Sequence, residues 1–303
     1  MVGTNSLRVA KNAAAFLKKA ETALGFPIEI IAGHEEARLI YLGVAHALPA
    51  SNNNRLVMDI GGGSTEFIIG HQLKPSKLES LYMGCVSHSL RYFPDGKLTK
   101  SNMKQAELAA QTEIQSIKTE FSSYHWQEAY GSSGTARAIG RILKLNQFGD
   151  SFSVEDITLK GLDQFRDYLL KIGDLKKVNL DGLHSDRIPV IAGGLAIMSA
   201  AFTELGIDRM YLTTGALRQG VLYDLLGRSY NDDMREVSVK QFMQRYRVDS
   251  AQASRIESFA MELGKQLLSN FPDEEEVEDA LQLLSWAARL HEVGISVAHS
   301  SYH

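Results

Sequence analysis

Residues 57–66 read Val-Met-Asp-Ile-Gly-Gly-Gly-Ser-Thr-Glu, and a second apolar run, Phe-Ile-Ile-Gly, follows them directly. Both flanks have the composition of β-strands, which predicts a hairpin with the glycines in its loop. Glycines let the backbone turn tightly and come close to an anion, so the amides of residues 61–65 can point at phosphate oxygens. In Walker and Rossmann sites the glycines lead into a helix instead. The hairpin therefore predicts either a different kind of phosphate loop or a glycine-rich structural turn.

Two carboxylates lie at the mouth of this loop, because Asp59 precedes the glycines and Glu66 follows them. Carboxylate oxygens suit a hard divalent cation such as Mg²⁺, which commonly bridges a protein and a phosphate. A second glycine-serine segment, Gly131-Ser132-Ser133-Gly134-Thr135, follows one predicted strand and opens a predicted helix. Its amides would carry the partial positive charge of a helix N-terminus, which attracts anions.

The composition excludes several classes of protein. With 303 residues, 44% of them hydrophobic, the chain is long enough for two domains with cores of their own. The formal net charge of −4 gives no general attraction to nucleic acid. The apolar runs are shorter than the ~20 residues of a membrane span, so no membrane span is expected. The single cysteine, Cys85, excludes an internal disulfide and indicates a reducing, cytoplasmic location.

The pattern of apolar residues divides the chain into three sections. Residues 5–24 are predicted to form one helix, followed by a strand at 27–32, a helix at 35–48 and a polar linker at 49–54 that marks a domain boundary. In the middle section we expect strands at 56–60, 65–69, 78–82, 126–130 and 209–212 and helices at 86–92, 101–121, 136–143 and 215–227. A helix beginning at Pro189 is expected to be interrupted at Gly193-Gly194. The last section is helical in pattern, with helices predicted at 237–246, 251–268 and 274–298.

Six strings of this sequence resemble, in order, the exopolyphosphatase and guanosine pentaphosphatase family. They are Gly33-His34-Glu35-Glu36-Ala37-Arg38-Leu39-Ile40-Tyr41, Asp59-Ile60-Gly61-Gly62-Gly63-Ser64-Thr65-Glu66, Met83-Gly84-Cys85-Val86, Gly131-Ser132-Ser133-Gly134-Thr135, Gly194-Leu195-Ala196-Ile197 and Gly215-Ala216-Leu217-Arg218-Gln219-Gly220. The two glycine-serine loops, one on a hairpin and one opening a helix, also resemble the wider actin-like and sugar-kinase superfamily.

The resemblance implies an α/β fold with an all-helical region behind it. A ribonuclease-H-like (actin-like ATPase) domain would occupy residues 55–227, and part of a preceding similar domain would occupy residues 1–54. An incomplete helical domain, similar to phosphohydrolases of the histidine-aspartate type, would occupy residues 228–303. The family resemblance also suggests a homodimer.

The chemistry that the resemblance implies is magnesium-dependent removal of the terminal phosphate from inorganic polyphosphate. Glu36 matches the family's general base for the attacking water, Asp59 and Glu66 match its Mg²⁺ ligands, and Arg8 matches an arginine that neutralises phosphate charge. The phosphate-binding residues implied by the two loops are Gly61, Gly62, Gly63, Ser64, Thr65, Gly131, Ser132, Ser133, Gly134 and Thr135. Without the resemblance, Glu36 and Arg8 would be interpreted as solvated helix charges.

Other functions fit the same residues. The nearest is hydrolysis of the 5′ γ-phosphate of guanosine pentaphosphate. Five basic residues could extend a track for long polyphosphate, which favours the polyphosphate interpretation, or could form only a solvated face. They are Arg228, Arg235, Lys240, Arg245 and Arg247. A non-catalytic polyanion-binding or regulatory fragment is an alternative of a different class, and a sugar kinase or actin-type ATPase is a third.

The sequence departs from the family pattern at its two ends. Family members begin with an Asp-x-Gly-Ser-Asn-Ser-type loop on the first hairpin, and nothing like it precedes Gly3. Without that loop the phosphate cleft would lack one wall, and the strand at residues 28–31 would have an exposed edge. We therefore expect weak or no hydrolysis by this chain alone.

Overall fold

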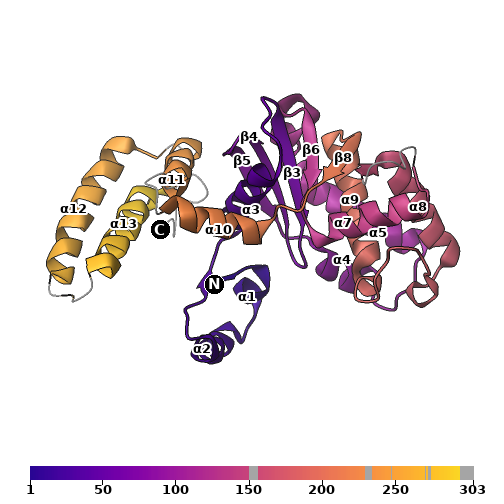
Figure 1. The fold of residues 1–303 in the computed structure, drawn as a ribbon, viewed down its shortest axis with the longest axis horizontal. Helices are drawn as coiled ribbons and strands as arrows, with labels where there is room; N and C mark the ends of the chain where they lie inside the picture. The colour runs from indigo at the N-terminus through magenta and orange to yellow at the C-terminus, as the bar shows by residue number, and fades with distance from the viewer. Residues whose placement is uncertain (150–155, 229–233, 247, 270, 272–273, 294–303) are drawn as a thin grey trace. The chain divides into compact units, whose positions relative to one another are not determined.

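The computed structural model describes residues 1–149, 156–228, 234–246, 248–269, 271 and 274–293. The chain divides into two compact units, Met1–Tyr223 and Asp224–His303. The first unit is built around a six-stranded sheet with the order β5-β4-β3-β6-β8-β7 (Figure 1). Its strands are β3 (Asn54–Ile60), β4 (Thr65–His71), β5 (Lys74–Leu81), β6 (Glu128–Gly131), β7 (Asp156–Thr158) and β8 (Arg209–Leu212). A separate two-stranded sheet pairs β1 (Val2–Gly3) with β2 (Glu29–Ile30).

The strand directions bring the two glycine-serine loops together. β3 pairs antiparallel with β4, which confirms the predicted hairpin, and it pairs parallel with β6. β6 in turn pairs parallel with β8. The carboxyl ends of these three parallel strands therefore lie at one edge of the sheet, which is where ligands bind in open α/β sheets. One loop follows β3 and the other follows β6.

Helices cover both faces of the sheet (Figure 1). α3 (Gly33–Ala47) packs on one face, where it forms a small core with β3, β4 and β5. The other face carries a larger core. The helices of that core include α4 (Cys85–Tyr92), α5 (Lys100–Gln115), α7 (Gly134–Leu145), α8 (Leu159–Ile172) and α9 (Ile191–Leu205). Because helices cover both faces of the sheet, the sequences of β3 and β4 are nearly continuous apolar runs.

The alternation of side chains along β3 determines the face of the sheet from which Asp59 projects. Met58 and Ile60 belong to the larger core, whereas Val57 belongs to the small core under α3. Side chains two residues apart share a face, so Asp59 projects to the α3 side of the sheet with Val57. The same rule places Glu66 on that side, because Ile68 of β4 packs with α3.

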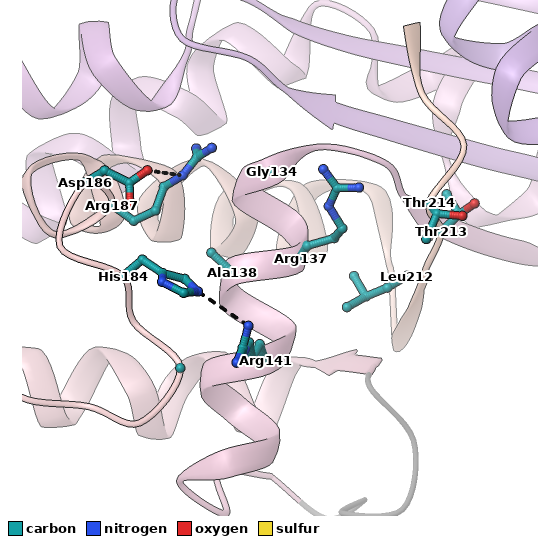
Figure 2. Close-up of a pocket in the computed structure, with 11 residues that line it drawn as sticks. Gly134, Arg137, Ala138, Arg141, His184, Asp186, Arg187, Leu212, Thr213 and Thr214 are labelled. Atoms are coloured by element: carbon teal, nitrogen blue, oxygen red, sulfur yellow. Dashed lines mark hydrogen bonds and ion pairs between the residues drawn. The ribbon is translucent and has the colours of Figure 1, made fainter. Parts of the chain in front are cut away.

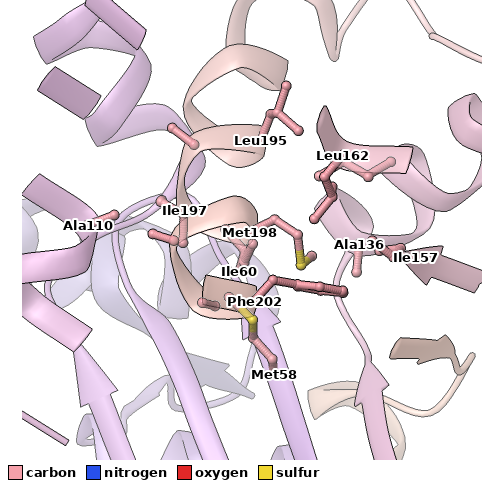
Figure 3. Packing of buried hydrophobic residues seen from close by; sticks show 14 of the residues in the cluster. Met58, Ile60, Ala110, Ala136, Ile157, Leu162, Leu195, Ile197, Met198 and Phe202 are labelled. Atoms are coloured by element: carbon pink, nitrogen blue, oxygen red, sulfur yellow. The ribbon is translucent and has the colours of Figure 1, made fainter. Parts of the chain in front are cut away.

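α9 runs through the larger core. Figure 3 shows its side chains beside those of β3, with Leu195, Ile197, Met198 and Phe202 from the helix and Met58 and Ile60 from the strand. The stretch Ile188–Leu205 is long and apolar enough to cross a membrane, but 72% of it is buried inside the fold. In this structure it is therefore a core helix.

The predicted interruption of this helix at Gly193-Gly194 is wrong. α9 continues through both glycines. The amide of Gly193 donates to Oγ of Ser89 in α4 at 3.2 Å, and a Cβ on Gly193 would lie 2.5 Å from that oxygen. The missing side chain thus lets two helices approach closely, which is the packing role that a helix interior offers to glycine.

The first predicted helix is also different. The structure has two helices, α1 (Asn5–Val9) and α2 (Ala13–Leu24), because the chain is extended at Ala10 with ψ of 122°. Tertiary contacts override the helical pattern here. Likewise, α5 ends at Gln115, a short α6 (Lys118–Phe121) follows it, and β7 and α8 were not predicted.

Close backbone contact fixes the position of α3. A Cβ on Gly43 would lie 2.2 Å from the carbonyl oxygen of Ala216 and 2.7 Å from the amide of Gly220. Gly220 belongs to α10 (Leu217–Arg228), and a Cβ on it would lie 1.7 Å from the carbonyl oxygen of Leu39. The string 215–220 therefore packs directly on α3.

We expect Gly43→Ala to destabilise the chain by about 1–3 kcal/mol, because the backbone of the segment around Ala216 must move. In an unhindered helix, alanine would instead stabilise the chain by about 0.5–1 kcal/mol relative to glycine. The sign of the change in the free energy of unfolding therefore shows whether Gly43 is crowded. Urea denaturation of the variant and the parent measures it. An unchanged or higher free energy of unfolding would show that α3 tolerates the extra methyl.

The second unit is helical, as predicted. Its helices are α11 (Met234–Arg245), α12 (Ser250–Leu268) and α13 (Glu274–Leu290). Asp249 caps α12 by accepting bonds from two amides. Arg289 of α13 binds Glu236 of α11 through two bonds, and Trp286 donates to the same carboxylate at 2.9 Å. The predicted end of the last helix at residue 298 lies outside the described residues.

Candidate active site

Asp59 and Glu66 face each other across the hairpin. They are direct partners in the antiparallel pairing of β3 with β4, and Ser80 of β5 is the partner of Glu66 on the other side. The Ser80 hydroxyl donates to Glu66 at 2.9 Å. Glu66 is only 1% exposed, whereas Asp59 is half-buried. Like charges directly opposite one another are unfavourable, and a proton or a cation between the two carboxylates would relieve this repulsion.

Glu36 comes to the same place from the first turn of α3. It is 8% exposed, and its Oε2 accepts a bond of 2.9 Å from Nη1 of Arg8. Its neighbour Glu35 is occupied elsewhere, because it accepts two bonds from the buried guanidinium of Arg38, at 2.8 and 2.7 Å. The structure therefore distinguishes the two acidic residues of the string, and it makes Arg38 the ion-pair partner of Glu35.

Arg8 is part of this cluster. The same Nη1 also donates to the carbonyl oxygen of Ile31 at 2.6 Å, which fixes α1 against the start of α3. The Thr4 side chain forms a further hydrogen bond with Glu36. The segment before α3 thus supplies the cationic partner of Glu36.

The three carboxylates repel one another in a buried setting. Burial raises the pKa of Glu66 from an ordinary value of 4.5 to about 8, and the nearby charge of Glu36 adds to the increase. Burial raises the pKa of Asp59 to about 6, although the Ser132 hydroxyl opposes the increase. The pKa of Glu36 is also raised, mainly by burial and against the effect of Arg8. A cluster of carboxylates whose pKa values are raised in this way is typical of active sites and of cation sites.

Three carbonyls of the first glycine loop accept hydrogen bonds within the protein. The amide of Gly61 donates to the carbonyl of Ser64 at 2.9 Å, which closes the turn. The carbonyls of Gly61 and Gly62 accept bonds from the first amides of α4, at residues 85–87. Within the described part of the chain, the amides of Gly62, Gly63 and Ser64 have no acceptor. These three amides are therefore available to an anion, whereas the amide of Gly61, which belongs to the same predicted set, is used within the turn.

Several side-chain hydroxyls of the two glycine-serine loops form hydrogen bonds within the protein. Thr65 donates to the carbonyl of Met83 at 2.6 Å, and Thr135 donates to the carbonyl of Ile60 at 3.1 Å. Ser133 caps α7 by accepting a bond from the amide of Ala136. These bonds tie both loops to the sheet.

Ser132 joins the second loop to the carboxylates. Its amide donates to the carbonyl of Met58 at 3.1 Å, and its hydroxyl donates to Oδ2 of Asp59 at 2.5 Å. Gly134 and Thr135 open α7, so their amides lie among the unpaired donors of a helix N-terminus. Gly131 ends β6, and a Cβ on it would crowd Ala136. The phosphate contacts predicted for this loop thus reduce to its backbone amides.

A basic cavity of about 650 Å³ borders the second loop (Figure 2). Arg137 and Arg141 lie on successive turns of α7, and His184 and Arg187 come from the connection that precedes α9. Nη1 of Arg141 lies 3.4 Å from Nε2 of His184. Arg137 also lies close enough to Asp59 to lower its pKa, so the cavity and the carboxylates are neighbours.

Sequence reasoning missed this cavity. The spacing of Arg137 and Arg141, four residues apart on a helix opened by a glycine-serine loop, was a usable signal. The position of Arg187 had no such signal, because only the fold places its guanidinium over Gly134. A Cβ on Gly134 would lie 2.7 Å from Nη2 of Arg187. The hydroxyls of Thr213 and Thr214, just beyond β8, border the cavity from the opposite side.

The basic track predicted for the helical region has weak support. Nζ of Lys240 lies 3.4 Å from Glu236, and Arg245 lies over the ring of Tyr246. These two charges are thus engaged locally. The side chains of Arg228 and Arg235 lie outside the described residues, as does Arg247.

The comparisons with known proteins identify the family of this chain. Residues 1–229 match the family model of the Ppx/GppA phosphatase family, and residues 234–303 match the model of domain III of Ppx/GppA phosphatases. The chain belongs to this family. The resemblance of the sequence strings and the α/β fold class are thereby confirmed.

One curated relative is a guanosine-5′-triphosphate,3′-diphosphate pyrophosphatase of Pseudoalteromonas translucida (strain TAC 125). It is 39% identical over all 303 residues of this chain, which spans 59% of that relative's length. Among solved structures, the Ppx/GppA enzyme of Aquifex aeolicus is 26% identical, with a TM-score of 0.59 over 73% of each chain. An exopolyphosphatase from Cytophaga hutchinsonii is 20% identical, with a TM-score of 0.63 over 75% of this chain and 74% of that one, which shows the shared fold.

Proposed function

We propose that this chain hydrolyses the terminal phosphoanhydride bond of inorganic polyphosphate, with Glu36 as the general base. The observation that carries the proposal is the convergence of Glu36, Asp59 and Glu66 beside two loops that present unpaired backbone amides. A base of raised pKa can accept the proton of a water molecule near neutral pH. The loop amides then stabilise negative charge on the transferring phosphoryl group.

We also propose that Asp59 and Glu66 hold Mg²⁺. The donor set fits this ion, because both are carboxylates with excess negative charge around them. Among the residues that the structure describes, no group of three or more His, Cys, Asp or Glu side chains is arranged to hold a metal ion. Mg²⁺ is commonly bound through one or two carboxylates, with water and phosphate oxygens completing its shell. When bound, the ion would neutralise charge on the phosphate oxygens.

Phosphate release from long-chain polyphosphate, measured with and without Mg²⁺, tests this proposal. We expect release that requires the ion. Binding of polyphosphate without any release would instead indicate a polyanion-binding protein. A homodimer and a cytoplasmic location stay predictions of the sequence.

Guanosine pentaphosphate is a second candidate substrate, because the basic cavity beside the second loop favours it. Its volume is within the usual range for small-molecule pockets. A nucleotide whose 5′ phosphates lie over the loops could place its 3′ diphosphate against the arginines of the cavity, where guanidinium groups suit phosphate. The 39% identical relative bears the name of an enzyme acting on this nucleotide.

Arg141→Ala separates the two substrates. If the nucleotide occupies the cavity, we expect its KM to rise about tenfold, while the KM for polyphosphate stays within about twofold, because only one substrate loses a charge-assisted bond. Steady-state kinetics on both substrates measures the effect, with exposed Lys171→Ala as the control for loss of a positive charge. Equal effects on both substrates would rule out a nucleotide-specific role for the cavity.

A further inference from the structure

The side chain of Asn5 lies against the tip of the first glycine loop. A Cβ placed on Gly63 would be 2.2 Å from Oδ1 of Asn5 and 3.7 Å from its Nδ2, so only glycine leaves room for this amide. The residues on either side of Asn5 along the segment fix its position, because Thr4 and Arg8 both hydrogen-bond Glu36. Asn5 is therefore held between the proposed base and the loop.

The amide nitrogen of Asn5 has no hydrogen-bond partner. Nδ2 is buried, and no acceptor in the described part of the chain reaches it. A buried donor without an acceptor lowers stability, and an alanine would fill the same place without that cost. A purely structural role does not explain an asparagine at this position.

The missing acceptor has a clear chemical character. The backbone amides of Gly62, Gly63 and Ser64 in the same loop are also without acceptors among the described residues. Four donors, one from the Asn5 side chain and three from the backbone of the loop that it contacts, thus have no acceptor among the described residues. An oxyanion with several acceptor oxygens satisfies such a group, and a phosphoryl group is one.

We propose that Asn5 is a substrate-binding residue whose side-chain amide donates to an oxygen of the phosphate held over residues 61–64. This inference rests on the proposed function, because it assigns a further contact to the same site. Because Nδ2 is buried in the ligand-free chain, this contact requires the amide to rotate about its Cβ–Cγ bond toward the phosphate. The contact comes from α1, on the side of Arg8 and Glu36, whereas Ser132 of the second loop bonds Asp59.

The test uses Asn5→Ala, with Asn12→Ala as the control because Asn12 is exposed and caps α2 without a side-chain bond. Two quantities are measured on the whole chain: the melting temperature without ligand, and the Kd for sodium tripolyphosphate by calorimetry. We expect Asn5→Ala to leave the melting temperature unchanged or higher, since an unsatisfied donor is removed. We expect it to weaken tripolyphosphate binding by about tenfold or more, as for loss of a bond to a charged group.

Gly63→Ala gives a second, independent variant. Its new methyl group would collide with Oδ1 of Asn5 and displace the amide, so it should weaken tripolyphosphate binding as well. Because both changes remove the same contact, the double variant Asn5→Ala/Gly63→Ala should bind no more weakly than Gly63→Ala alone. Fully additive losses would contradict the shared contact.

The outcomes distinguish this inference from the proposed function. A lower melting temperature of Asn5→Ala with an unchanged Kd would make Asn5 a structural residue and overturn the inference, while hydrolysis by the parent chain would be unaffected. Tripolyphosphate binding that depends on Asn5, without phosphate release by the parent chain, would support the inference and overturn the proposed hydrolysis. If the parent chain does not bind tripolyphosphate, both fail.

Discussion

Glu36→Gln should reduce phosphate release from polyphosphate by about 10²–10⁴-fold while leaving polyphosphate binding within about threefold, since general-base catalysis contributes roughly this factor. Glutamine keeps the size of the side chain and one oxygen that can accept the bond from Arg8, but it cannot take a proton from water. The loops and Arg8 stay in place, so the loss should appear in kcat and not in Kd. Single-turnover phosphate release and calorimetry measure the two quantities.

The matched control for this variant is Glu113→Gln, because Glu113 is exposed on α5 and lies far along the chain from the site. It should behave as the parent. If Glu36→Gln keeps most of its activity, another group activates the water, and if it loses binding and turnover together, Glu36 acts mainly by holding Arg8.

Glu66→Gln should have the second-largest effect, with opposite consequences for stability and activity. The folded chain raises the pKa of Glu66 to about 8, so the folded state binds this proton more tightly than the unfolded state does. Stability due to this group therefore falls as the pH rises from about 4 to about 8. Removing the carboxylate should raise the melting temperature at pH 8 by several degrees and leave it nearly unchanged at pH 4.

Loss of the same carboxylate should abolish the response to Mg²⁺. In the parent chain, Mg²⁺ at pH 8 should raise the melting temperature, because a ligand that binds only the folded state stabilises it. In Glu66→Gln this rise should disappear. Hydrolysis should fall by about 100-fold or more, since mutation of even an outer-shell partner of a metal lowers metal affinity or activity by 10–100-fold. Thermal melts at several pH values, with and without MgCl₂, provide the measurement. A parent chain whose stability is indifferent to both pH and Mg²⁺ would contradict the assignment.

Much of the architecture was predictable because local patterns carry it. The hairpin of β3 and β4 follows from two apolar runs separated by glycines, and the strand at Arg209–Leu212 was predicted with its observed bounds. Elements with weak or conflicting local signals were missed. α1 and α2 read as one helix, since only the contacts of Arg8 with Ile31 and Glu36 show why the chain turns there.

The candidate site was only partly predictable. The family resemblance supplied Glu36, Asp59, Glu66 and Arg8, and the fold brings all four together. Sequence could not show that Arg8 binds the proposed base, nor that the hydroxyls of the second loop are used inside the protein. For the cavity beside α7, the sequence offered only the spacing of Arg137 and Arg141, because the lining residues outside α7 come from two separate segments.

The sequence by itself determined that residues 57–66 form a hairpin with a carboxylate on each side of a glycine loop, because glycine content and alternating apolar residues act over a few positions. Only the tertiary structure decided what surrounds that hairpin. Pairing of β3 with β6 places the second loop beside it, and close packing at Gly43 fixes α3 with Glu36 above the carboxylates. These contacts join residues that are distant along the chain, and their distances depend on how helices and strands pack, which no local pattern records.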